Sequence, residues 1–237
     1  YYTDYIDGFD KYGGGLRAFS LRDGKAVEIT PPPLRKGIIG RYDLIFGADR
    51  VVFDYKERDG EGFRIYEAAV DGSSWRPVTF PPPDEQELIR KYRARNLDFW
   101  AGKPIRYTHH TDDMHPAYLP DGGIVFVSTR CQYAILCDGP DVFTTSVLYR
   151  MNADGSGMKR LTNSAVSESA PSITNDGRIL YTRWEYVDKG AVSVKCLWAV
   201  NPDGTGCVEI FGNDIDFPDT CNVGRAIPGF DNLYVYI

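Results

Sequence analysis

The chain has 237 residues, of which 43% are hydrophobic and 14% aromatic, and it carries a formal net charge of -6. This length and apolar content can build a sizeable core, but no stretch approaches the roughly 18 apolar residues of a membrane span. The negative charge argues against general nucleic-acid binding. The 24 glycines and 15 prolines divide the chain into short segments, and only one segment has a helical pattern, so we expect an all-β chain.

A hairpin pattern recurs four times along the chain. Its clearest copy, 148–162, alternates apolar and polar residues on either side of an Asp154-Gly155 turn. Asp-Gly pairs tolerate the positive φ angles that tight hairpin turns require. The spacings between successive copies are 48, 83 and 49 residues, so the middle spacing equals one period plus an insertion. The turn glycines of the four copies are Gly24, Gly72, Gly155 and Gly204.

A second pair of strands is predicted ahead of the later hairpins. The stretches 115–130 and 170–186 share a proline, a short strand, an Asp-Gly turn and a second strand rich in aromatic and β-branched residues. Each full unit therefore has four strands. Four antiparallel strands repeated every 45 to 50 residues or so are typical of a β-propeller, in which each unit is one blade. We predict an all-β fold with four-stranded antiparallel blades in a partial ring, plus one short helical insertion.

The prediction divides the chain into six parts. Because the sequence starts at Tyr1 without a signal segment, we expect a processed or excised piece. Tight Asp-Gly turns should lie on one face of the blades and long loops on the other, which makes the loop face the candidate for function. In chain order, the parts are the end of a preceding blade or domain at 1–30, a blade at 38–80, the helical insertion and its loop at 81–113, blades at 114–163 and 169–211, and the start of a further blade at 222–237.

The insertion carries the helical pattern. It begins with prolines and offers Asp84 as an N-cap with Glu87 three residues later, which predicts a helix of about three turns. Its basic residues form either a solvated helix face or a docking patch for an acidic partner or the propionates of a cofactor. These residues are Arg90, Lys91, Arg93 and Arg95.

All three histidines lie in one stretch, THHTDDMHP, which leads from the insertion into the innermost strand of a blade. Imidazoles and carboxylates grouped in this way can ligate a metal or shuttle protons, although their spacing matches no standard zinc pattern. The alternative is a set of structural hydrogen bonds. The candidate catalytic residues on the loop face are His109, His110, Asp112, Asp113 and His115.

Two further candidates involve the loops after second strands. Cys131 and Cys137 bracket QYAIL and could form a disulfide, bind a metal such as zinc as thiolates, or remain free buried thiols. Arg183 and Tyr186 are candidate cofactor-binding residues, with a blade-locking ion pair as the alternative for Arg183. The sequence contains no CxxCH haem attachment, Gly-rich phosphate loop or Ser-centred elbow.

The phrases HPAYLPDG, STRC and TRWEY go beyond generic propeller patterns. Together with the hairpins around them, over 112–206, they resemble the propeller region of the hydrazine synthase alpha-subunit family of anaerobic ammonium-oxidising bacteria. The Asp-Gly repeats alone are also similar to TolB-like propellers. The resemblance implies the propeller portion of a c-type haem redox enzyme that makes hydrazine from nitric oxide and ammonium, with the haem attached through segments outside this chain.

The same resemblance implies partners and a compartment. The partners would be other domains of the same subunit, beta and gamma subunits and a cytochrome electron donor. The compartment would be non-cytosolic, either the anammoxosome lumen or a periplasm-like space. The segment would border a haem site without being catalytic by itself. The alternative function is a non-catalytic TolB-like propeller that binds other proteins.

Overall fold

The computed structural model describes residues 12–58, 60–91, 95–97, 105–107, 109–136, 144–186, 194–213, 215 and 217–237. Within these ranges the strands form three four-stranded and three two-stranded antiparallel sheets, and one segment is α-helical. The prediction of an all-β fold with four-stranded blades and one short helix is confirmed. The chain divides into two compact units, Tyr2–Pro116 and Ala117–Ile237.

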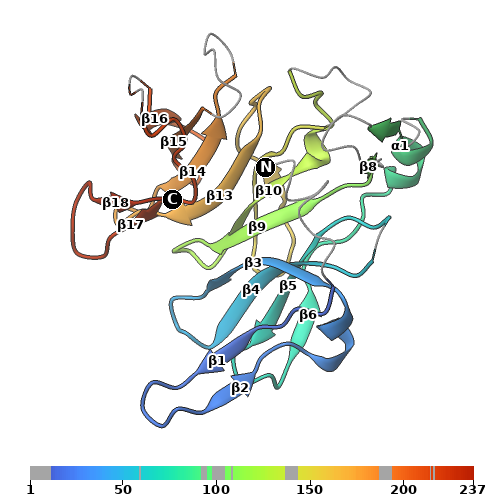
Figure 1. The fold of residues 1–237 in the computed structure, drawn as a ribbon, viewed down its shortest axis with the longest axis vertical. Coiled ribbons are helices and arrows are strands. Elements are labelled where there is room, and N and C mark those ends of the chain that lie inside the picture. Colours follow the sequence, from blue (N-terminus) through green and yellow to red (C-terminus); the bar gives the residue numbers. More distant parts are fainter. Residues whose placement is uncertain are drawn as a thin grey trace. The chain divides into compact units, whose positions relative to one another are not determined.

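The first unit contains one complete blade and one hairpin (Figure 1). The hairpin pairs β1 (Arg17–Phe19) with β2 (Ala26–Glu28). A 3-10 helix (Pro32–Lys36) leads from the hairpin to the blade. Leu16, Ala18 and Ile29 pack against Val51 and Phe53 of the blade, so the hairpin covers one face of it. The blade strands are β3 (Ile38–Leu44), β4 (Arg50–Lys56), β5 (Arg64–Ala69) and β6 (Trp75–Pro77).

The insertion contains the predicted helix. Helix α1 (Glu85–Lys91) has seven described residues, and residues 92–94 lie outside the described part of the chain. The chain then pairs β7 (Arg95–Leu97) with β8 (Ile105–Tyr107), a small sheet that the sequence did not predict. In the described ranges, no helix has the length and apolarity that crossing a membrane would need.

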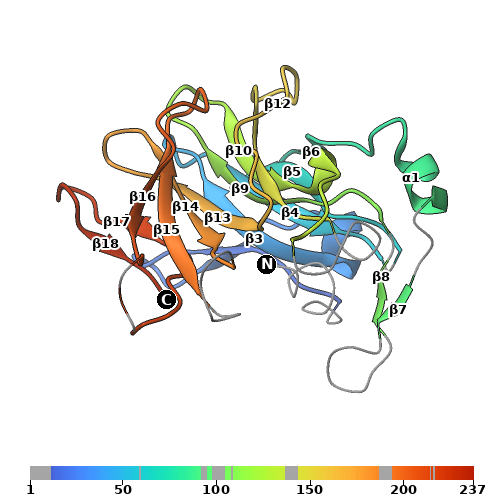
Figure 2. The ribbon, with the colours of Figure 1, turned by 90° about the horizontal axis from the view of Figure 1, so that it is seen from above.

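The second unit contains two blades and a final hairpin, which lie side by side in Figure 2. Strand β9 begins just before the unit boundary and forms the edge of the first sheet. A 3-10 helix (Thr129–Cys131) follows β10. The first blade has β9 (Asp113–Tyr118), β10 (Ile124–Ser128), β11 (Val147–Met151) and β12 (Lys159–Arg160); the second has β13 (Glu168–Ile173), β14 (Ile179–Trp184), β15 (Lys195–Val200) and β16 (Val208–Phe211); and β17 (Arg225–Ala226) pairs with β18 (Tyr234–Val235).

Local chemistry sets the tight turns. Gly155 has a φ of 86°, and its N–H donates to the carbonyl oxygen of Asn152 at 2.9 Å. One carboxylate oxygen of Asp154 accepts the N–H of Ser156 at 2.9 Å. Glycine adopts this positive φ without strain, and a short acidic side chain can bond the main chain two residues on. The Asp-Gly pairs therefore form the turns that the sequence predicted.

The second strand of each blade is buried on both faces. Ile124, Val125, Phe126 and Val127 of β10 are all 0% exposed, although successive side chains point to opposite sides of a strand. On one side of this sheet, β10 packs against β13 of the next blade, as in stacked blades. Each of these strands also places an aromatic residue directly opposite one on the third strand. The pairs are Phe53 with Tyr66, Phe126 with Tyr149, and Tyr181 with Trp198.

Candidate functional site

The histidine segment is buried. Each of its three histidines and two aspartates is at most 6% exposed. Asp112 is 0% exposed and accepts the main-chain N–H of Phe63 at 2.8 Å. Phe63 in turn accepts the N–H of Asp113 through its carbonyl oxygen at 3.0 Å. The segment therefore pairs with the chain just ahead of β5 and is not an open loop.

An ion pair ties the same segment to the insertion. Arg64 of β5 lies 2.7 Å from Glu85, the first residue of α1, and both side chains are largely buried. The same Glu85 oxygen accepts the N–H of Thr111 at 2.8 Å, and Arg64 donates to the carbonyl oxygen of Thr111. A Cβ added at Gly62 would lie 1.8 Å from that carbonyl oxygen, so only glycine fits there. These contacts anchor the helix onto the blade.

His115 owes its position to its backbone. Its φ is 53°, which is unusual for a residue that precedes proline. Its N–H donates to one oxygen of buried Asp54 at 2.7 Å, and the other oxygen accepts the N–H of Arg41 at 2.6 Å. Ala170, also before a proline in the first strand of its blade, has a φ of 51°. Because an alanine adopts the same conformation at the matching position, the positive φ follows from the backbone of the blade and does not indicate a function of the His115 imidazole.

Burial governs the protonation states in the segment. Burial lowers the pKa of His110 to about 4 and raises the pKa of Asp112 to about 7. The imidazole Nε2 of His110 lies 3.7 Å from a carboxylate oxygen of Asp112. Near neutral pH this histidine is neutral and the aspartate is partly protonated. Both side chains are buried within the first unit.

Of the two cysteine candidates, the structure describes Cys131, which is a free thiol. Burial raises the pKa of Cys131 to about 11, and its sulfur lies 3.4 Å from the carbonyl oxygen of Thr145. Without a bound cation, burial therefore keeps the Cys131 side chain a neutral thiol. Cys137 lies outside the described residues. Over the described ranges, no group of three or more His, Cys, Asp and Glu side chains is placed to hold a metal ion.

Arg183 lies within β14, where the sequence had predicted a loop. Its guanidinium makes two contacts with Glu185, at 2.8 and 3.1 Å, and its central carbon lies 3.5 Å from the ring centroid of Trp198. Trp198 also donates its indole N–H to Glu185 at 2.7 Å. The ring of Tyr186 lies 5.0 Å from that of Trp184. The Arg183 guanidinium therefore forms an ion pair with Glu185, which agrees with the alternative of a blade-locking ion pair.

These arrangements also bear on a haem. All three histidines are buried, so none of them presents an open imidazole nitrogen as an axial ligand. Arg183, a candidate cofactor-binding residue, already faces a carboxylate. The sequence analysis expected the haem to be attached through segments outside this chain.

Glu168 is a buried titratable residue to which the sequence analysis gave no role. It is 1% exposed, and one carboxylate oxygen accepts the N–H of Leu148 at 2.9 Å and the hydroxyl of Thr162. Burial raises its pKa to about 7. Both Glu168 and Asp113 lie three residues before the proline of a first strand. Aligning the two repeats on their prolines would have identified this acidic position.

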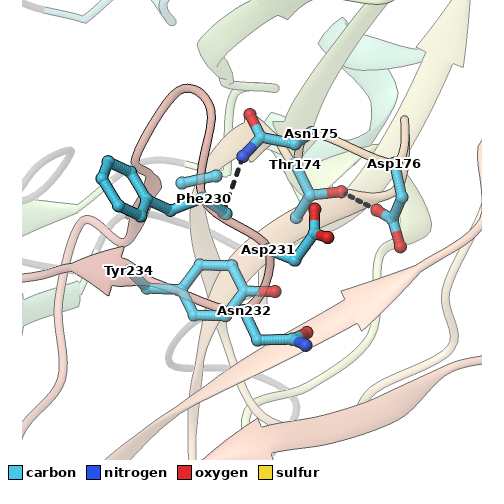
Figure 3. A pocket seen from close by; sticks show the side chains of 8 residues that line it. Thr174, Asn175, Asp176, Phe230, Asp231, Asn232 and Tyr234 are labelled. Carbon is cyan, nitrogen blue, oxygen red and sulfur yellow. Dashed lines mark hydrogen bonds between the residues drawn. The ribbon is translucent and has the colours of Figure 1, made fainter.

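The second unit also has a small polar cavity of about 260 Å³ next to the tight turn between β13 and β14 (Figure 3). Asn175 supports it, since its side-chain nitrogen donates to the carbonyl oxygens of Ile227 and Phe230 at 2.9 and 3.0 Å. The sequence analysis had set aside the face with the tight turns. The lining residues are Thr174, Asn175, Asp176, Ala226, Phe230, Asp231, Asn232 and Tyr234.

No protein-family model matches the chain, and no curated protein matches it. Solved structures do match. Hydrazine synthase of Kuenenia stuttgartiensis is similar at 16% identity and a TM-score of 0.63, over 90% of this chain and 30% of that one. Oligogalacturonate lyase from Vibrio parahaemolyticus is similar at 14% identity and a TM-score of 0.52, over 84% of this chain and 48% of that one.

An oligogalacturonate lyase in complex with manganese is similar at 13% identity and a TM-score of 0.50, again over 84% of this chain and 48% of that one. The chain therefore spans between about a third and a half of the length of these proteins. At such low identities the likeness concerns the fold alone. The chain has a β-propeller fold.

Proposed function

We propose that the chain is the propeller portion of a larger haem redox enzyme resembling hydrazine synthase, where it shapes or borders a haem held by other segments. Two observations support the proposal. The fold likeness to hydrazine synthase covers 90% of the chain with a TM-score of 0.63, and the phrases HPAYLPDG, STRC and TRWEY of the sequence resemble the same family. We also propose that the chain has beta and gamma subunits and a cytochrome electron donor as partners, and that it lies in a non-cytosolic compartment.

Within that enzyme the segment acts as a scaffold. The observation that carries this role is the burial of the predicted catalytic residues, each at most 6% exposed. The Asp112 carboxylate accepts a main-chain N–H of its own unit, and Glu85 and Arg64 hold the neighbouring turn of chain. Buried carboxylates with main-chain partners hold the segments that they bond in place. The segment thus attaches the insertion to a blade.

A non-catalytic propeller that binds other proteins is the second candidate. It is favoured by the exposed apolar side chains of the first unit, where Leu21 is 94%, Phe46 72% and Phe19 62% exposed. Exposed apolar side chains of this size are available to contact a partner protein. This candidate needs no haem.

A spectrum of the full-length parent protein separates the two functions. The haem enzyme should show a Soret band and contain iron in a fixed ratio to protein. A purified parent protein with neither would overturn the haem proposal and leave the binding module.

The scaffold role is tested in the same protein with His110→Gln. We expect unchanged turnover together with a lower unfolding midpoint, because the imidazole is buried. Lost turnover at an unchanged midpoint would instead make His110 catalytic. Exposed Glu57→Gln is the matched control, and both its turnover and its midpoint should stay at the wild-type values.

A further inference from the structure

The polar cavity of the second unit contains the carboxylate of Asp231. This carboxylate takes part in no ion pair among the described residues. The aspartate at the same position of the β13–β14 turn, Asp176, accepts the guanidinium N–H of Arg178 at 2.8 Å. The residue two positions after Asp231 is Leu233, which is uncharged. The β17–β18 turn therefore has the carboxylate without the arginine that accompanies it in the β13–β14 turn.

Asn232 adds an amide to the same cavity (Figure 3). Its φ is 59°, and the residues at the same position of the β9–β10 and β13–β14 turns are Gly122 and Gly177, with φ angles of 83° and 85°. Glycine adopts such angles with less strain than asparagine does. The geometry of the turn therefore does not require the amide, which offers an acceptor oxygen and two donor hydrogens to a ligand.

An aromatic ring is the third element of the cavity. Tyr234 packs against the buried cluster of Leu180, Leu197 and Cys221, which holds its ring in place. The face of a tyrosine ring attracts cations. The cavity measures about 260 Å³, which is far more space than a single metal ion or water molecule needs. A small organic cation therefore fits this cavity better than a metal ion does.

The same unit shows how a carboxylate and an aromatic ring together hold a guanidinium. The Arg183 guanidinium makes two contacts with Glu185, at 2.8 and 3.1 Å, and its central carbon lies 3.5 Å from the ring centroid of Trp198. A guanidinium is planar, so it can stack on a ring while its fork of N–H groups binds one carboxylate. Asp231 and Tyr234 supply the same two chemical groups to the cavity.

We propose that the cavity binds a guanidinium group, with its N–H groups on the Asp231 carboxylate and its plane against the Tyr234 ring. The side-chain oxygen of Asn232 accepts a further N–H. The guanidinium belongs either to a free small molecule or to an arginine side chain of a partner protein, because both present the same chemistry. The inference goes beyond the proposed function and does not depend on a haem.

Isothermal titration calorimetry of the full-length parent protein with methylguanidinium tests the proposal. We expect saturable binding at one site per chain. Methylammonium should bind much more weakly, because it has the same charge but lacks the planar fork. Added salt should weaken the binding, because it screens the ion pair. No saturable binding overturns the proposal, and so does equal binding of methylammonium, since charge alone would then explain it.

Two variants test the carboxylate and the ring. D231N keeps the shape of an exposed side chain and removes its charge, so it should bind methylguanidinium about tenfold more weakly with an unchanged unfolding midpoint. Y234L lacks the aromatic face and should bind about two- to fivefold more weakly. D203N, at another exposed turn of the same unit, is the matched control and should bind as wild type does. Wild-type affinity of D231N would overturn the proposal.

Two larger probes distinguish the sources of the guanidinium. Butylguanidinium represents a free alkylguanidine, and N-acetyl-arginine methylamide represents an arginine within a polypeptide. Tighter binding of butylguanidinium assigns the site to a small molecule, whereas tighter binding of the capped arginine assigns it to a partner protein. Either result supports the proposal, because both require recognition of the guanidinium, and binding of neither probe overturns it.

Discussion

Glu168→Gln should remove a pH dependence from the stability of the protein. In the folded chain, burial raises the pKa of Glu168 from its usual 4.5 to about 7. Between these two values the unfolded chain has released the proton and the folded chain still holds it. The free energy of unfolding therefore falls as pH rises through this window, and the loss is complete above about pH 7.

The size of the effect follows from the shift in pKa. Each unit corresponds to about 1.4 kcal/mol, so the change from 4.5 to about 7 is worth about 3 kcal/mol. Glutamine resembles the protonated acid in shape, and its oxygen can still accept the N–H of Leu148. The stability of the variant relative to wild type should thus be about 3 kcal/mol higher at pH 8 than at pH 4.5.

The assay is urea unfolding followed by circular dichroism between pH 4.5 and 8. Exposed Glu57→Gln is the control, and its stability should follow the wild-type curve. Asp112 contributes in the same direction, because burial raises its pKa from 3.8 to about 7. The E168Q variant still contains Asp112 and therefore keeps part of the wild-type dependence of stability on pH. Parallel curves for wild type and E168Q across this pH range would refute the reasoning, since Glu168 would then titrate as an exposed acid does.

Three other changes test the turns, the ion pair and the thiols. Gly155→Val should lower the free energy of unfolding by on the order of 1 kcal/mol or more, because a β-branched residue resists a φ of 86°; an unchanged urea midpoint would mean that the turn tolerates it. Arg183→Ala should lower the free energy of unfolding by about 1 to 2 kcal/mol, because Glu185 loses its cation. Stability at the wild-type level would count against a structural ion pair. At pH 7.5, iodoacetamide should modify exposed Cys207 well before Cys131, whose raised pKa keeps it a thiol; mass spectrometry that finds the reverse order would contradict this assignment.

The strand repeat could be predicted because its causes are local. An Asp-Gly pair such as Asp154-Gly155 turns the chain through hydrogen bonds within five residues, between Asn152 and Ser156. Alternating apolar residues then place the strands on either side of each turn. The pairing of Arg95–Leu97 with β8 was not predicted, because the sequence pattern contains no sign of it. That pairing depends on a partner strand further along the chain.

The candidate residues were identified by type, and the sequence could not assign their roles. The stretch THHTDDMHP has the composition of a proton-transfer or metal site. Its burial depends on Phe63, which lies 49 residues earlier, and on Glu85, which lies 26 residues before Thr111. No local pattern contains such distant contacts. The five predicted catalytic roles stay predictions, and the buried positions favour a structural use.

The sequence by itself determined the four-stranded repeat, its turns and the chemistry available at each position. The tertiary structure decided which of those groups meet water, because burial depends on segments that are far apart along the chain. Glu168 illustrates the difference: the sequence places a carboxylate before Pro171, but only the packing of β13 against β11 makes that carboxylate buried, bonded to Leu148 and hard to ionise. Desolvation is a property of the assembled fold, so it cannot be deduced from residue type and spacing.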